Sequence, residues 1–158
     1  MERIAIFPGS FDPFTVGHES IVRRAIPMFD KISIMIGYNA NKKTFFSLEK
    51  RMKWINQVFE NDSNVEVQAF EGLTVDFCKM VNAKYILRGL RTASDFEYER
   101  AIAQVNKQMY PEIESVFLLT TPEHTPIKST IVRDIIQHGG DARKFLPKCL
   151  NFDEFKTE

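Results

Sequence analysis

Short runs rich in β-branched and aromatic residues alternate with longer amphipathic stretches along the whole chain. Such alternation favours βα units around a parallel sheet over an all-helical or an all-β domain. Short apolar runs predict five strands, at residues 3–7, 31–38, 64–70, 85–88 and 115–119. Helical patterns cover residues 17–29, 48–60, 73–82, 94–110 and 129–138, and a further short helix is expected near the carboxyl terminus.

The chain contains no linker, internal repeat or change of composition that would divide it, and 158 residues is an ordinary size for one domain. Because 44% of its residues are apolar, it can bury a core without disulfides or a structural metal. We therefore expect residues 1–158 to form a single doubly wound, Rossmann-like α/β domain, in which a five-stranded parallel sheet carries helices on both faces.

Local signals predict where several of these helices begin and end. Ser47 is expected to cap the helix that starts at residue 48. Ser94 and Glu97 have the spacing of a capping box for the helix at residues 94–110. The pair Gly139-Gly140 is expected to end the helix at residues 129–138, because glycine readily adopts the left-handed conformation that closes a helix.

The charge balance limits the partners that this chain can attract. Its 21 basic and 21 acidic side chains cancel, so no long-range field favours nucleic acid or an anionic membrane as a partner, and neither is expected. No apolar run approaches the ~20 residues that cross a bilayer, and no secretory signal is evident. Cys78 and Cys149 lie far apart without a C-x-x-C spacing, so a cytoplasmic location is expected.

The segment after the first predicted strand carries unusual chemistry. Ligands of open α/β sheets bind beyond the carboxyl ends of the strands, where the strand order reverses. Ser10 lies in this segment, and Gly17-His18 lies at the following helix start, where free amides attract anions and His18 adds a donor for a phosphate oxygen. Alone, His18 would more simply be a capping or solvent-exposed residue. The chain contains neither G-x-x-x-x-G-K-[ST] nor G-x-G-x-x-G. The sequence therefore gives little support to a P-loop NTPase or a dinucleotide-binding dehydrogenase.

A second segment, Arg88-Gly89-Leu90-Arg91, follows the fourth predicted strand. Arginine forks bind phosphate at two points, and if the strand order reverses between the first and fourth strands, this segment shares a crevice with Ser10 and His18. The alternative is that the two arginines pair with acidic side chains of the next helix, namely Asp95, Glu97 or Glu99.

Two further segments could extend such a phosphate site. Lys42-Lys43 follows the second predicted strand beside two asparagines, although such a pair is more often a solvated loop face. Ser129 and Thr130 lie at the start of the last long helix, where a hydroxyl either caps the helix or binds phosphate oxygens.

Taken together, these segments resemble the phosphopantetheine adenylyltransferases. The resemblance rests on Ser10-Phe11-Asp12-Pro13, Thr15-Val16-Gly17-His18, Arg88-Gly89-Leu90-Arg91, Asp95-Phe96-Glu97-Tyr98-Glu99 and Ile127-Lys128-Ser129-Thr130, and it spans nearly the whole chain. T-x-G-H alone marks only the wider nucleotidyltransferase superfamily. The resemblance implies transfer of AMP from ATP to 4′-phosphopantetheine, which gives dephospho-coenzyme A and pyrophosphate, by a homohexamer that uses Mg²⁺ held mainly through the ATP phosphates.

The resemblance also implies roles for individual residues. The catalytic residues would be Ser10, His18, Lys42 and Arg91. Phosphopantetheine would be bound by Ser10, Lys42, Thr74 and Arg88. ATP would be bound by Ser10, Phe11, His18, Gly89, Leu90, Arg91, Glu99, His124, Thr125, Pro126, Ile127, Lys128, Ser129 and Thr130.

The chain departs from the family pattern at two places. Ser10 stands where threonine is frequent, but the hydroxyl is kept, so little loss is expected. Residues 124–130 read His-Thr-Pro-Ile-Lys-Ser-Thr where many members have an aromatic residue and a run of serines. The charge of Lys128 either aids triphosphate binding or points outward, which would leave the binding to Ser129 and Thr130.

Direct in-line attack on the α-phosphorus, without a covalent enzyme intermediate, is the expected mechanism, because positioning two polyanions and neutralising their charge are its main demands. Two alternatives remain open. One is a related nucleotidyltransferase that adenylates nicotinamide mononucleotide or transfers CMP to a phosphorylated alcohol. The other is a nucleotide-binding sensor that has lost turnover.

The helix at residues 94–110 carries apolar residues that could face either the core or another subunit. We expect most of them to face the core: Phe96, Ala101, Ile102, Val105 and Met109.

Overall fold

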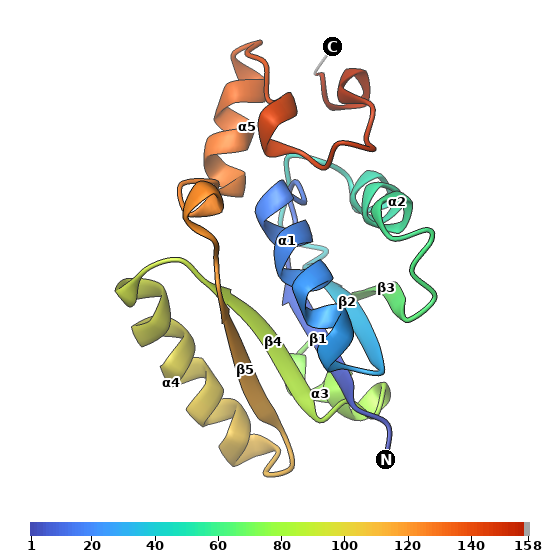
Figure 1. The fold of residues 1–158 in the computed structure, drawn as a ribbon, viewed down its shortest axis with the longest axis vertical. Helices are drawn as coiled ribbons and strands as arrows, with labels where there is room; N and C mark the ends of the chain where they lie inside the picture. The colour runs from blue at the N-terminus through green and yellow to red at the C-terminus, as the bar shows by residue number, and fades with distance from the viewer. Residues whose placement is uncertain (157–158) are drawn as a thin grey trace.

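A computed structural model describes residues 1–156; residues 157–158 of the predicted domain lie outside the described part. Five parallel strands form one sheet in the order β3-β2-β1-β4-β5 (Figure 1). The strands are β1 (Ile4–Gly9), β2 (Lys31–Gly37), β3 (Val65–Phe70), β4 (Tyr85–Leu90) and β5 (Glu114–Leu119). The strand order reverses between β1 and β4, as the sequence analysis assumed, so the predicted doubly wound fold is confirmed.

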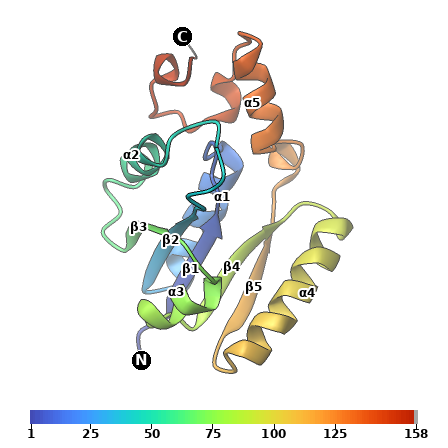
Figure 2. The same ribbon diagram turned by 180° about the vertical axis from the view of Figure 1, so that it is seen from behind.

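Helices cover both faces of the sheet (Figures 1 and 2). The helices are α1 (Val16–Ala25), α2 (Leu48–Val58), α3 (Thr74–Met80), α4 (Ala93–Met109) and α5 (Ser129–Gln137). Short 3₁₀ helices are η1 (Ile26–Met28), η2 (Pro122–His124), η3 (Arg143–Phe145) and η4 (Phe152–Phe155). None of the helices within residues 1–156 is both long and apolar enough to cross a membrane.

Side chains alternate along the central strands and build a separate core on each face. Ala5 and Phe7 of β1 pack with the apolar sides of α1 and α2. Ile4 and Ile6 of the same strand pack with Phe77 of α3 on the other face. This alternation is the two-residue period of a strand that is buried on both sides.

The two central strands are longer than predicted. Pairing with β2 continues as far as Gly9 opposite Ile36, and pairing with β5 continues as far as Leu90 opposite Leu119. The glycines at these strand ends leave room for close neighbours. A Cβ atom on Gly89 would lie 3.1 Å from the Ile21 side chain, so glycine lets α1 pack tightly on β4.

Of two helix caps that were predicted from the sequence, the structure confirms one and contradicts the other. Ser47 caps α2 as predicted, since its hydroxyl accepts the Lys50 amide at 3.2 Å. The prediction of a capping box formed by Ser94 and Glu97 is wrong. Thr92 is the N-cap, and its hydroxyl accepts the Asp95 amide at 3.2 Å. The helix begins earlier than expected because the backbone at Thr92 is extended and its hydroxyl satisfies the third amide of the helix.

Gly139 and Gly140 end α5 as predicted. Gly139 has φ of 74°, in the left-handed region, and its amide bonds the Ile136 carbonyl. The Gly140 amide bonds the Ile135 carbonyl at 2.8 Å. These two bonds form a Schellman motif, which satisfies carbonyls that a helix end leaves free.

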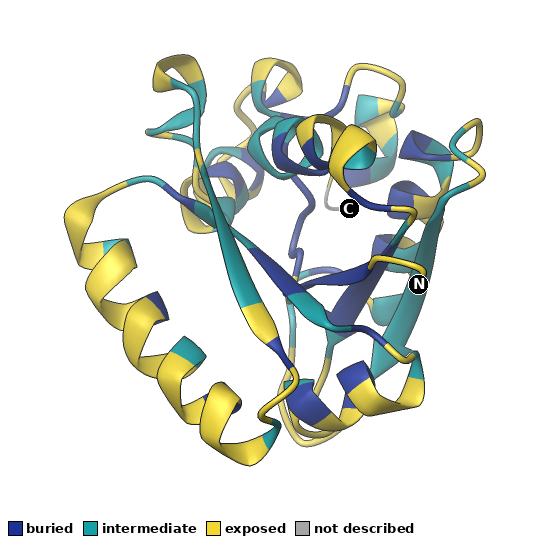
Figure 3. Ribbon diagram, turned by 60° about the horizontal axis from the view of Figure 1, so that its bottom comes forward, coloured by how far each residue is buried: buried dark blue, intermediate teal, exposed yellow. Residues whose placement is uncertain are grey.

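The prediction that most apolar residues of α4 face the core is wrong. Along this helix only Glu99 and Asn106 are buried, and the ribbon is exposed over most of its length (Figure 3). The exposed apolar residues are Phe96, Ala101, Ile102, Val105 and Met109. The buried positions of the helix go to polar groups, because Glu99 pairs with a β4 arginine and so occupies the side that faces the sheet.

A third core joins α2 and α5 to the carboxyl-terminal segment. Trp54 of α2 stacks on Phe155, with ring centroids 3.9 Å apart, and Phe46 packs against both rings. Val132 and Ile136 of α5 belong to the same cluster. This core therefore fixes α5 relative to the loop that leads from β2 into α2.

Candidate active site

Two adjoining cavities open at the carboxyl ends of β1 and β4, where the strand order reverses. The first has a volume of about 330 Å³ and the second about 480 Å³. Pro8, Gly9, Ser10 and Arg88 line both of them. The cavities are thus separated only by the end of β1, its following turn and one arginine.

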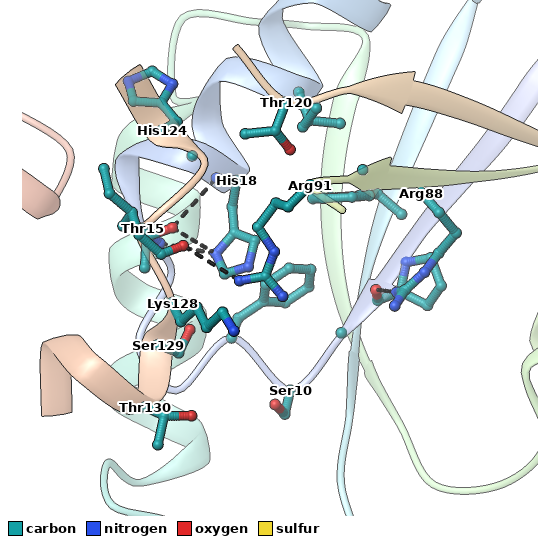
Figure 4. Close-up of a pocket in the computed structure, with 18 residues that line it drawn as sticks. Ser10, Thr15, His18, Arg88, Arg91, Thr120, His124, Lys128, Ser129 and Thr130 are labelled. Carbon is teal, nitrogen blue, oxygen red and sulfur yellow. Dashed lines mark hydrogen bonds between the residues drawn. The ribbon is translucent and has the colours of Figure 1, made fainter. Parts of the chain in front are cut away.

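The first cavity brings together the segments that the sequence analysis singled out (Figure 4). Ser10 and His18 come from the segment after β1, and Arg88 and Arg91 come from the end of β4. The predicted ATP residues that line it are Ser10, Phe11, His18, Gly89, Arg91, His124, Ile127, Lys128, Ser129 and Thr130. The predicted meeting of distant segments is therefore observed.

His18 is held by the start of α1. Its Nδ1 accepts the backbone amide of Thr15 at 2.9 Å, and the His18 amide in turn bonds the Thr15 hydroxyl at 3.4 Å. The imidazole also packs edge-on against Phe11, with centroids 5.1 Å apart, and beside Phe14 at 5.3 Å. The helix cap and the aromatic rings thus fix the direction of the imidazole.

His18 is neutral at physiological pH. Burial, together with the positive charges of Arg88 and Arg91, lowers its pKa from 6.5 to about 3. Since Nδ1 accepts a hydrogen bond from an amide, the single proton of the neutral ring lies on Nε2. Nε2–H is then free to donate to an anion in the first cavity.

Both arginines pair with acidic residues of α4, as the alternative in the sequence analysis envisaged, and both still line the first cavity. Nε and Nη2 of Arg88 donate to Glu99 at 3.0 and 2.7 Å, and Nη1 donates to the Pro8 carbonyl. Arg91 Nε donates to Asp95 at 3.3 Å. The ion pairs hold the guanidinium planes in place and leave further N–H groups for a phosphate.

The start of α5 forms the opposite wall of the first cavity. Ser129 does not cap the helix; its hydroxyl donates to the Pro13 carbonyl at 2.9 Å and so ties α5 to the turn after β1. Lys128 occupies the N-cap position without a side-chain cap bond. Its side chain extends toward Arg91 rather than away from the cavity (Figure 4).

The second cavity contains all four residues predicted to bind phosphopantetheine, Ser10, Lys42, Thr74 and Arg88. Lys42 reaches it from the loop between β2 and α2, and Thr74 from the start of α3. The rest of the lining is largely apolar and includes Met35, Phe70, Ile86, Ile102 and Phe117. A lining that combines two cations with many apolar side chains suits a phosphate that carries a long arm.

Four predicted ATP residues lie elsewhere. Glu99 lines the second cavity, where its carboxylate binds Arg88. Leu90 is buried, and Thr125 bonds the Thr121 carbonyl within its own turn. Pro126, like Leu90 and Thr125, is absent from the lining of either cavity, so contacts of these residues with ATP stay predictions.

Several residues that line the cavities were not predicted from the sequence. Thr120 lines the first cavity, and Tyr98 and Asn106 line the second. Thr120 directly follows β5, so the rule that ligands lie beyond strand ends would have found it. The α4 residues carried no such signal, because helical periodicity does not show which face lines a cavity.

The described residues offer no ready-made metal cage. Within residues 1–156, no three His, Cys, Asp or Glu side chains are close enough together to hold a metal ion. The first cavity is lined by cations, hydroxyls and amides, which suit phosphate oxygens rather than a bare cation.

Comparisons with known proteins agree with this geometry. Residues 6–135 match the cytidylyltransferase-like family. The phosphopantetheine adenylyltransferase of Flavobacterium psychrophilum is 51% identical over 94% of this chain and 97% of its own length. That of Cytophaga hutchinsonii is 50% identical over 93% of this chain and 98% of its own length.

Solved structures share the fold at low sequence identity. A putative nicotinate-nucleotide adenylyltransferase from Vibrio parahaemolyticus is 19% identical, with a TM-score of 0.67 over 94% of this chain and 96% of that one. A bifunctional NMN adenylyltransferase/ADP ribose pyrophosphatase from Francisella tularensis is also 19% identical, with a TM-score of 0.71 over 96% of this chain. The chain spans 46% of that longer protein.

Proposed function

The chain belongs to the phosphopantetheine adenylyltransferases of the cytidylyltransferase-like family, and we propose that its two cavities hold ATP and 4′-phosphopantetheine side by side. The enzyme transfers the adenylyl group of ATP to 4′-phosphopantetheine and releases dephospho-coenzyme A and pyrophosphate. The observation that carries the proposal is the shared wall of the cavities, where Ser10 and Arg88 line both.

ATP occupies the first cavity in this proposal. Its triphosphate lies between His18 and Arg91 on one side and the start of α5 on the other, where Lys128 and the helix amides carry positive charge. 4′-Phosphopantetheine occupies the second cavity, with its phosphate toward Lys42 and Arg88 and its arm along the apolar lining.

The reaction is a direct in-line displacement. A terminal phosphate oxygen of 4′-phosphopantetheine forms a bond to the α-phosphorus of ATP while the bond between the α-phosphorus and the pyrophosphate oxygen breaks. No general base is needed, because the attacking phosphate is ionised at neutral pH. Nε2–H of His18 donates to the α-phosphate oxygens, where charge builds up in the transition state, and the neutral ring needs no proton transfer to do so.

We propose that Mg²⁺ enters with ATP. The lining of the first cavity fits triphosphate oxygens, through which the ion would mainly be held, and the hydroxyls of Ser129 and Thr130 would be available to help hold it. When bound, Mg²⁺ shields the charge of the triphosphate. The protein's own cations hold the remaining phosphate oxygens in place.

We also propose that the enzyme forms a homohexamer in which another copy covers α4. The apolar residues Val105 and Met109 lie four residues apart on the same side of α4 and are 53% and 44% exposed, which suits a surface that another copy covers. Light scattering of the purified protein tests this assembly. A Val105→Glu variant is expected to dissociate, whereas a wild-type protein that is monomeric at micromolar concentration would contradict the proposal.

We propose a cytoplasmic location, which the state of the cysteines supports. Cys78 and Cys149 are both free thiols, as in most proteins of a reducing compartment. Burial raises the pKa of Cys78 to about 12, so this thiol is unreactive at neutral pH and has a packing role.

The decisive experiment measures pyrophosphate release with ATP, Mg²⁺ and 4′-phosphopantetheine. Nicotinamide mononucleotide with ATP, and a phosphorylated alcohol with CTP, serve as competing substrate pairs. We expect turnover with 4′-phosphopantetheine to exceed that with either alternative by at least ~10³ in kcat/KM, because both alternatives leave charged or apolar lining unpaired. ATP binding without pyrophosphate release for any acceptor would instead indicate a sensor.

A further inference from the structure

Arg51 of α2 is a buried arginine that lines neither cavity but contacts the residues from which both are built. Only 2% of its surface is exposed. Its Nη1 donates to the Ser10 carbonyl at 2.6 Å, and its Nη2 donates to the Thr44 hydroxyl at 3.4 Å. Ser10 lines both cavities, and Thr44 lines the second. Arg51 thus links the turn after β1 to the loop that carries Lys42.

Stability alone does not account for an arginine at this position. Both of its hydrogen bonds go to neutral oxygens, and its Nε lacks a partner among the described residues. Burial lowers the pKa of Arg51, an effect that the Asp12 carboxylate opposes without cancelling. Because a buried charge with incomplete compensation is unfavourable, a packed apolar side chain would stabilise α2 at least as well.

The turn that Arg51 contacts adopts an unusual conformation. Phe11 has φ of 49°, in the left-handed region that bulky residues rarely occupy. The Asp12 carboxylate accepts the amides of Phe45 and Phe46, both at 2.8 Å. The turn and the loop are therefore joined twice, through Asp12 and through Arg51, and neither can move without breaking one of these links.

We propose that Arg51 is a positioning residue for the acceptor substrate: it fixes Ser10 and the Lys42 loop relative to each other, so that both reach the phosphate of 4′-phosphopantetheine. This inference rests on the proposed function. Arg51 touches no substrate and acts through Ser10 and Thr44. Ser10 also lines the first cavity, but the ATP groups His18 and Arg91 are held by the Thr15 amide and by Asp95 rather than by Arg51, so ATP binding depends less on Arg51 than acceptor binding does.

The test compares Arg51→Gln and Arg51→Lys with the wild-type enzyme. Steady-state pyrophosphate release gives kcat and the KM of each substrate, and calorimetry gives the Kd of each substrate without turnover. For Arg51→Gln we expect the KM for 4′-phosphopantetheine to rise about tenfold and kcat to fall about tenfold, with the Kd for ATP changed less than about threefold. Arg51→Lys can still donate to the Ser10 carbonyl and is expected to recover part of both losses.

Two further variants separate positioning from folding. Ile55→Val removes a methyl group from the fully buried core side of the same helix and is expected to lower Tm without changing either KM. Thr44→Val keeps the side-chain shape but removes the hydroxyl, which accepts from Arg51 and donates to the Phe46 carbonyl at 2.7 Å, and is expected to raise the acceptor KM about threefold. Because Thr44 itself lines the second cavity, its effect is compared with that of Thr44→Ser, which keeps the hydroxyl, and this pair tests the link if the Arg51 variants do not fold.

The proposal is overturned if these variants lower only Tm and leave the acceptor KM and Kd within about twofold of wild type. It is also overturned if ATP and acceptor binding weaken equally, since that would indicate general disorder of the site. A wild-type protein that releases no pyrophosphate contradicts the proposed function instead, and the calorimetric Kd for 4′-phosphopantetheine still tests the role of Arg51.

Discussion

Arg88 and Glu99 form a two-point ion pair between β4 and α4, with Nε and Nη2 of the arginine 3.0 and 2.7 Å from the two carboxylate oxygens. Arg88 lines both cavities, so the pair lies where the two cavities adjoin and where the proposed substrates would meet. The carboxylate both orients the guanidinium fork and neutralises the charge that attracts the acceptor phosphate. Orienting the guanidinium is expected to favour turnover, whereas neutralising its charge is expected to weaken acceptor binding. A substitution of Glu99 can separate these two effects.

Glu99→Gln keeps the size of the side chain but removes its charge. We expect 4′-phosphopantetheine to bind about three- to tenfold more tightly, because the charge of Arg88 is no longer compensated, and kcat to fall because the fork is less well oriented. Calorimetry and pyrophosphate release measure the two effects. Glu97→Gln is the matched control, since Glu97 lies on the same helix but pairs with Arg100 at the surface. Weaker acceptor binding by Glu99→Gln would contradict the expectation.

His18→Gln removes the imidazole donor. We expect kcat to fall by roughly 10² to 10³, since this donor acts mainly on charge that develops in the transition state, with a smaller change in the KM for ATP. Steady-state pyrophosphate release measures the loss, and circular dichroism checks the fold. His138→Gln, at an exposed position of the chain, should retain full activity. A His18 variant that turns over like wild type would rule out the assigned role.

The lowered pKa of His18 predicts a specific dependence on pH. The folded state holds this ring with a pKa of about 3, against 6.5 for an ordinary histidine, so the unfolded state binds the proton more readily. The contribution of the neutral His18 ring to the free energy of unfolding is therefore complete above pH 6.5 and is lost as the pH falls from 6.5 toward 3.

Nuclear magnetic resonance measures this titration directly. We expect the imidazole to remain neutral, with its proton on Nε2, down to pH 5. Urea unfolding at pH 7.5 and 5.0 should show a loss of unfolding free energy in the wild type that exceeds the loss in His18→Gln by about 2 kcal/mol. A His18 ring that becomes charged near pH 6.5 in the free enzyme would contradict the neutral donor.

Lys42 and Lys128 line different cavities, which predicts separate effects on the two substrates. Lys42→Ala should raise the KM for 4′-phosphopantetheine about tenfold or more, whereas Lys128→Ala should raise the KM for ATP about three- to tenfold. Lys43→Ala is the control, because Lys43 neighbours Lys42 but is exposed and outside the cavity lining. Equal effects of both substitutions on both substrates would contradict the assignment of the cavities.

The parallel sheet was predictable from general rules, and the meeting of Ser10 with Arg88 follows from the same rules once the strand order reverses between β1 and β4. A βα chain forms a parallel sheet, and its ligands lie where the strand order reverses. The partners of Arg88 and Arg91 were not predictable, because Asp95, Glu97 and Glu99 share one helix, and only the packed angle of α4 decides which of them reach β4.

Two other features depend on contacts that a linear pattern does not contain. The periodicity of α4 shows that Ile102, Val105 and Met109 lie near one another, but it does not show whether the sheet or solvent covers them. Arg51 had no local signal, because its partner Ser10 is 41 residues away along the chain.

The wall that both cavities share has a consequence for how the reaction ends. Dephospho-coenzyme A contains the adenylate and the pantetheine arm in one molecule, so in the proposed arrangement it would fill both cavities at once, whereas pyrophosphate would leave from the first cavity alone. We therefore expect the larger product to exclude either starting molecule until it dissociates, and to inhibit competitively against each of them.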